Sequence, residues 1–238
     1  MAREPFAFLL GLGRKPYLWA MRIIDLSHTI STDTLTYQGL PKPIICDFMS
    51  REASQEHYEA GTSFQIGRID MVVNSGTYID VPFHRYADGQ DLSVMPIQHF
   101  VGLPGVKVNH FFEQNDLEIG REVFEDIDVK GKAVLIYTGW DRFWQTEQYF
   151  KPHPYLNEQA ALYLREEGAV LVGTDAKNLD DTRGKARPAH TILLKENILI
   201  VEHLNGLDRL PGEGFYFSAI PPKFEGLGSF PVRAFAEI

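Results

Sequence analysis

Residues 74–89 hold the densest group of side chains that could do chemistry. The segment reads Asn-Ser-Gly-Thr-Tyr-Ile-Asp-Val-Pro-Phe-His-Arg-Tyr-Ala-Asp-Gly, which sets the carboxylate of Asp80 four residues before the imidazole of His84. Pro82 between them disfavours a helix. In an extended segment alternate side chains face the same side, so the even-numbered residues from 74 to 84 share one face. We therefore expect Asp80 and His84 to lie in one pocket.

A carboxylate beside an imidazole has two chemical uses and one structural use. The pair suits a divalent ion such as Zn²⁺ or Mn²⁺, or a general base that the carboxylate orients. The structural alternative is that Asp80 caps a turn while His84 is a hydrogen-bonded interior residue. For an isolated pair the structural alternative is favoured, so a catalytic interpretation requires further partners.

A second group of polar residues lies more than a hundred positions further along the chain. Glu202 stands in the apolar segment Leu-Ile-Val-Glu-His-Leu, and His190 follows Pro188 and Ala189. Burying an unpaired carboxylate is expensive, so Glu202 requires a partner, which a metal ion or His190 would supply. The alternative is that His190 caps a short helix and that Glu202 is a charge at a strand end.

Strands are the main elements that must position these residues. Apolar, β-branched segments predict strands at 21–30, 64–73, 105–110, 133–138, 169–174, 198–203, 215–219 and 232–236, with a tight bend at Gly76. The clearest helix starts at the N-cap Asn157 and ends before Gly168. Almost wholly apolar strands indicate a sheet covered on both faces, and Gly and Pro clusters argue against a repeating βα barrel. We predict a mixed α/β, strand-rich domain.

The order of these motifs resembles the cyclase family that includes bacterial kynurenine formamidase and isatin hydrolase. That family carries the pattern His-x-Gly-Thr-His-x-Asp-x-Pro-x-His, and the segment from Asn74 to His84 matches five of its seven fixed positions. Asn74 and Tyr78 replace the two early histidines. The resemblance continues in Met21-Arg-Ile-Ile-Asp-Leu-Ser, Gly139-Trp140, Gly173-Thr-Asp and Gly228-Ser-Phe-Pro-Val-Arg-Ala. It implies the swivelling β/β/α fold of that family.

The resemblance also implies an activity, namely metal-dependent hydrolysis of a small-molecule amide, cyclic amide, ester or lactone. Carried over by position, it makes Asp80, His190 and Glu202 metal ligands and His84 the proton donor and acceptor. An amide or a phenol is not a usual zinc ligand, so one Zn or Mn ion is expected rather than two. Further expected roles are an oxyanion hydrogen bond from Tyr78 and contacts to the substrate or to the ligands from Asn74 and Trp140.

Two other functions remain open at this point. Loss of two ligand positions is compatible with a metal-independent lyase or isomerase that uses His84 with Asp80 or Glu202 as acid and base. A non-catalytic homologue that binds a ligand in the same pocket is the other alternative.

Composition limits the partners of the protein. A formal charge of −9 and a pI near 5.4 would repel a phosphate backbone, so nucleic acid is excluded. No apolar run reaches the ~20 residues that a membrane span requires, and a cytoplasmic location is the default expectation. The partners that remain are a small-molecule substrate and, as the resemblance implies, further copies of the chain in a dimer or tetramer.

The length of 238 residues suits one large domain, which we place at 21–238 behind an N-terminal arm or extension at 1–20. The single cysteine, Cys46, excludes an intrachain disulfide and a cysteine-based zinc site. Its apolar neighbours predict that it is an inert thiol in the core.

Overall fold

One nine-stranded sheet runs through the body of the protein, in the order β1-β13-β11-β5-β7-β9-β10-β4-β12. The fold comes from a computed structural model that describes residues 22–37, 39–113 and 116–238. The predicted arm at 1–20 lies outside the described residues.

The centre of the sheet is parallel and its two sides are antiparallel. The parallel strands are β5 (Leu103–Asn109), β7 (Ala133–Tyr137), β9 (Leu171–Thr174) and β10 (Leu199–Glu202). Antiparallel strands flank β5 on one side and β10 on the other, and they are β1 (Ile23–Asp25), β13 (Arg233–Glu237), β11 (Glu213–Ile220), β4 (Tyr78–Asp80) and β12 (Ser229–Pro231).

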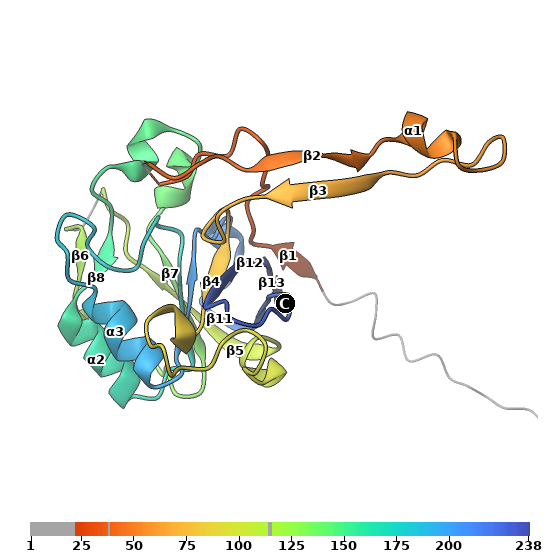
Figure 1. The fold of residues 1–238 in the computed structure, drawn as a ribbon. Helices are drawn as coiled ribbons and strands as arrows, with labels where there is room; N and C mark the ends of the chain where they lie inside the picture. The colour runs from red at the N-terminus through yellow and green to blue at the C-terminus, as the bar shows by residue number, and fades with distance from the viewer. Residues whose placement is uncertain (1–21, 38, 114–115) are drawn as a thin grey trace, which may run out of the picture.

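Apolar side chains cover both faces of the central strands, as the sequence predicts. In β7, Val134 and Ile136 belong to a core cluster that includes Leu164 and Leu193 of the helices, whereas Leu135 belongs to the cluster on the other face. Helices α2 (Glu158–Glu166) and α3 (Pro188–Lys195) lie together against one face (Figure 1). The strand-rich, mixed α/β prediction is therefore confirmed.

Most predicted elements occur where their local signals lie. Each of the eight predicted segments overlaps a strand, although the strands found in the first two segments, Ile23–Asp25 and Ile66–Asp70, are much shorter than predicted. Asn157 caps α2 by accepting a hydrogen bond from the Ala160 amide at 2.8 Å, and Gly168 adopts a φ of 79° after the helix. The short elements not yet named are β6 (Glu118–Ile119) with β8 (Tyr155–Leu156), and 3-10 turns at Pro82–His84, Ile97–His99, Arg121–Val123, Trp140–Phe143, Glu147–Phe150 and Leu207–Arg209.

A two-stranded hairpin extends away from the body of the protein (Figure 1). It consists of β2 (Ile44–Met49) and β3 (Ile66–Asp70), with the short helix α1 (Arg51–Gln55) between them. Cys46 lies on this hairpin and is exposed, so its prediction as a core residue is wrong. Its apolar neighbours have no core to join, because the hairpin projects into solvent.

The described helices include no candidate for a membrane span. Within 22–37, 39–113 and 116–238, none of them combines the length and apolar character that a bilayer crossing would demand.

Candidate metal and catalytic site

Strand pairing brings the two predicted groups of polar residues together. β4 and β10 run antiparallel, with Tyr78 opposite Glu202 and Asp80 opposite Ile200. Residues that are opposite each other in an antiparallel pair project to the same face. The hydroxyl of Tyr78 donates a short hydrogen bond to Oε2 of Glu202. Segments more than a hundred residues apart thus meet through the register of one strand pair.

His190 enters the site from the first turn of α3, where Asp180 fixes it. The carboxylate of Asp180 accepts hydrogen bonds from the amides of Ala189 and His190, at 2.8 and 3.1 Å, and from Nδ1 of His190 at 2.6 Å. The other ring nitrogen, Nε2, lies 3.6 Å from Oδ2 of Asp80 and 3.4 Å from Oε1 of Glu202. A carboxylate that holds one ring nitrogen while the other faces the site is the usual support for a metal-binding histidine.

The surrounding carboxylates set the charge of the His190 ring. Burial lowers the pKa of His190, but its hydrogen bond to Asp180 and the nearby carboxylates of Asp80 and Glu202 outweigh burial and raise the pKa to about 10. Without a metal ion the ring is therefore a buried cation that balances part of the negative charge around it.

Glu202 is fully buried and well supplied with donors. Its carboxylate accepts the Leu179 amide at 2.6 Å and the Asn178 side chain at 3.3 Å, in addition to the Tyr78 hydroxyl. Burial raises the pKa of Glu202 to about 7, against the lowering effect of His190. The predicted need of Glu202 for a partner is met by this set.

Asp80 carries the clearest sign that a cation belongs in the site. Asp80 is only 1% exposed. Its Oδ1 accepts a short hydrogen bond from Ser229, whereas its buried Oδ2 has no hydrogen-bond partner among the described residues. A buried carboxylate oxygen without a donor costs free energy that a cation would recover. Ligand atoms of Asp80, His84 and His190 all lie within 4.8 Å of one another, and nitrogen and oxygen donors of this kind fit Zn²⁺ or Mn²⁺.

His84 lies at the opening of the site and is held by a neighbour. Its Nδ1 is 2.8 Å from the hydroxyl of Ser229, which also contacts Asp80. Gly228 allows this approach, because a Cβ at that position would lie 2.2 Å from the backbone nitrogen of His84. The predicted shared pocket of Asp80 and His84 therefore exists, with Ser229 between them.

The remaining predicted residues have less direct positions. The single proton of the Tyr78 hydroxyl is donated to Glu202, so donation to an oxyanion would require that bond to break. Asn74 is half-buried, and no hydrogen bond of its side chain occurs in the part of the chain that the structure describes. Trp140 lies in a separate aromatic cluster, where its indole donates to the backbone oxygen of Tyr149 at 3.1 Å.

Sequence reasoning missed Asp180 and Ser229, and with them Asn178. Asp180 stands beside Asp181 in a polar loop, where nothing local separates a buried carboxylate from an exposed one. Ser229 belongs to the segment 228–234 that resembles the family, but a serine by itself predicts no role. Both contacts depend on pairing between distant segments.

The site opens to the surface through a small cavity of about 100 Å³. Its lining consists of His84, Arg85, Asn178, Arg187 and His190. None of the larger cavities is lined by Asp80, His84, His190 or Glu202, although Asp180 borders one of about 220 Å³.

Comparison with known proteins gives one consistent result. Residues 24–181 match the family model described as "Putative cyclase". The kynurenine formamidase of Bacillus cereus is 29% identical over 213 residues, which cover 89% of this chain and 95% of that protein. A solved structure described as a "predicted metal-dependent hydrolase" from Bacillus stearothermophilus has a TM-score of 0.72 at 25% identity, over 92% of this chain and 98% of the other. An isatin hydrolase bound to thioisatinate shares the fold, with a TM-score of 0.77 at 22% identity over 92% of each chain.

Proposed function

The chain belongs to the putative cyclase family, and from that membership we propose that it is a metal-dependent hydrolase similar to kynurenine formamidase. Its proposed substrate is a small molecule with an amide, cyclic amide, ester or lactone bond. The observation that carries this proposal is the buried Oδ2 of Asp80, which accepts no hydrogen bond from the described residues and has only the longer ion-pair contact of 3.6 Å with Nε2 of His190.

Asp80, His190 and Glu202 are the residues proposed to hold one Zn or Mn ion. Asp80 and His190 belong to the cluster of candidate ligand atoms, and Glu202 lies 3.4 Å from His190. When bound, the ion would polarise the scissile carbonyl and make water more acidic. Asp180 would keep Nε2 of His190 directed into the site, and Tyr78 would hold the carboxylate of Glu202 in place.

His84 is proposed to move the proton during hydrolysis. Ser229 occupies its Nδ1, so proton exchange with water and with the leaving group would use Nε2. Its side chain is 36% exposed, which places the ring at the boundary between the site and solvent. The same geometry would let His84 act as a third ligand in place of Glu202, and replacement of His84 distinguishes the two roles.

The decisive experiment is metal analysis of freshly purified protein together with a substrate screen. N-formyl aromatic amines, cyclic imides, isatin and lactones would be tested with and without added Zn²⁺ or Mn²⁺. We expect about one equivalent of metal per chain and activity that a chelator abolishes. Metal below ~0.1 equivalent that added ions do not restore would refute the proposal. If His84→Ala loses turnover but keeps its metal, His84 transfers the proton. If His84→Ala loses its metal, His84 is a ligand.

A metal-independent acid and base enzyme is the second candidate. It is favoured by Tyr78, which stands where the family pattern has a histidine and whose hydroxyl is bonded to Glu202. His84 with Asp80 or Glu202 would then catalyse a lyase or isomerase reaction. Turnover that survives complete removal of metal would support this candidate over hydrolysis.

A further inference from the structure

Two arginines lie at the mouth of the site without an ion-pair partner among the described residues. Arg85 and Arg187 line the same cavity as His84 and His190. Five of the eleven described arginines form ion pairs, and neither Arg85 nor Arg187 is one of them. What distinguishes this pair is its position: both guanidinium groups border one small cavity on a chain with a net charge of −9, so positive charge is concentrated at that opening.

Neutral groups hold both side chains in place. Nε of Arg85 donates to the Thr191 hydroxyl at 3.1 Å. Nη1 of Arg187 lies 3.1, 3.0 and 2.6 Å from the backbone oxygens of Asp181, Gly184 and Ala186. These contacts use one nitrogen of each guanidinium, so the remaining N–H groups are available to an anion. A guanidinium matches the two oxygens of a carboxylate, and the cavity lining contains no carboxylate of the protein.

We propose that Arg85 and Arg187 form a carboxylate-binding subsite, so that the substrate carries a carboxylate beside the bond that is cleaved. The cleavage of such a substrate rests on the proposed hydrolase function, whereas the binding of its carboxylate by the two arginines does not. The arginines would hold the carboxylate at the mouth while the reacting carbonyl reaches the ligands behind His84. They are thus binding residues that determine specificity.

The test compares 3-formamidobenzoate with formanilide, which differ only in the carboxylate. Calorimetric binding and hydrolysis to formate and the aromatic amine would both be measured. We expect the anionic compound to bind at least about tenfold more tightly, and Arg85→Gln or Arg187→Gln to remove most of that preference, chiefly through KM. Arg121→Gln is the matched control, because Arg121 pairs with Glu125 away from the cavity.

The outcomes separate this inference from the proposed function. Three outcomes overturn the subsite: the two compounds bind equally, neither compound binds, or the preference for the anionic compound survives in both arginine variants. A carboxylate preference that the variants lose, without turnover of either compound, supports the subsite and counts against hydrolysis of formamides. Arg85→Lys, which retains the charge, should keep part of the preference.

Discussion

Removing the hydroxyl of Tyr78 tests how the buried carboxylate of Glu202 is stabilised. In Tyr78→Phe the ring remains, but Glu202 loses the donor at Oε2 and keeps Leu179 at 2.6 Å and Asn178 at 3.3 Å. A hydrogen bond to a buried charged group contributes about 1.5–3 kcal/mol, and one to a neutral group about 0.5–1.5 kcal/mol. The loss in free energy of unfolding should therefore depend on whether Glu202 is ionised.

The direction of the pH dependence follows from the pKa of Glu202, which burial raises to about 7. At pH 5 the carboxyl is protonated in the folded protein, so only a neutral hydrogen bond is lost. At pH 8.5 it is ionised, and the Tyr78 hydroxyl, which lowers the pKa of Glu202, stabilises the charged form. Because its folded pKa lies above its unfolded value, Glu202 favours folding less as pH rises, and Tyr78→Phe should steepen that decline.

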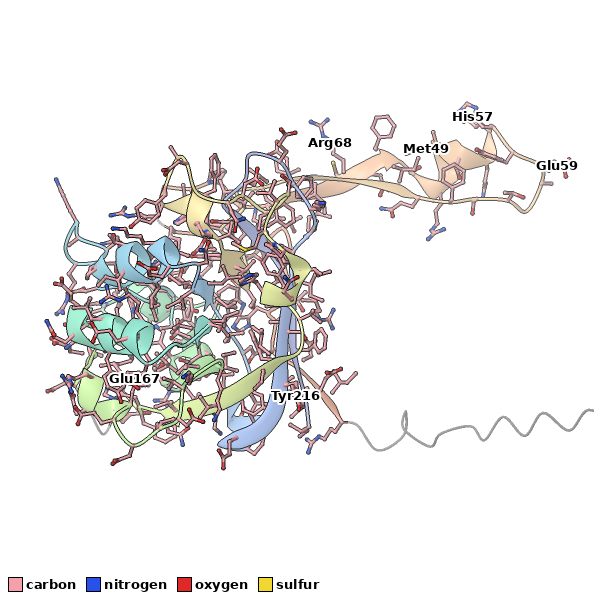
Figure 2. All side chains as sticks on the ribbon, turned by 90° about the horizontal axis from the view of Figure 1, so that it is seen from below. Met49, His57, Glu59, Arg68, Glu167 and Tyr216 are labelled. Atoms are coloured by element: carbon pink, nitrogen blue, oxygen red, sulfur yellow. The ribbon has the colours of Figure 1, made fainter. Side chains whose placement is uncertain are left out.

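Urea unfolding of metal-free protein in a chelator, at pH 5 and pH 8.5, would measure the effect. We expect Tyr78→Phe to lower the free energy of unfolding by about 1 kcal/mol at pH 5 and about 2 kcal/mol at pH 8.5. Tyr216→Phe is the control, because Tyr216 is 55% exposed and lies at the surface of the body (Figure 2). It should leave the free energy of unfolding unchanged at both pH values. A loss that is equal at both pH values, or larger at pH 5, would refute the reasoning.

Three further predictions concern the support of the site. Asp180→Asn should weaken Zn²⁺ or Mn²⁺ binding about 10- to 100-fold in calorimetry, because Nδ1 of His190 loses its charged partner; unchanged affinity would contradict this role. Asn74→His with Tyr78→His restores the family pattern and should raise the metal content from one ion per chain toward two. A content that stays at one ion would show that the two replaced histidines do not set the number of ions. Gly228→Ala should lower the free energy of unfolding by about 1–3 kcal/mol in urea, since a Cβ there would meet the His84 backbone at 2.2 Å. A stable Gly228→Ala protein would show that the closing strand can shift.

Local sequence determined the elements and part of the site. Apolar β-branched runs specified the central strands, and Asn157 with Gly168 specified the ends of α2, because capping and strand preference act within a few residues. Asp80 and His84 share a pocket as predicted, but the predicted extended run through His84 is wrong, because Pro82–His84 form a 3-10 turn after the short strand β4. The family pattern supplied His190 and Glu202, which spacing alone could not have joined to them.

Only the tertiary structure decided which distant groups meet and which face water. Three contacts of the site arise from packing between distant parts of the chain. The strand register sets Tyr78 opposite Glu202, and Asp180 lies behind His190. Ser229 lies between Asp80 and His84. Exposure is likewise a property of the assembled fold. The segment around Cys46 has the composition of a buried strand, yet it projects into solvent, because burial depends on what packs against a strand as well as on its residues.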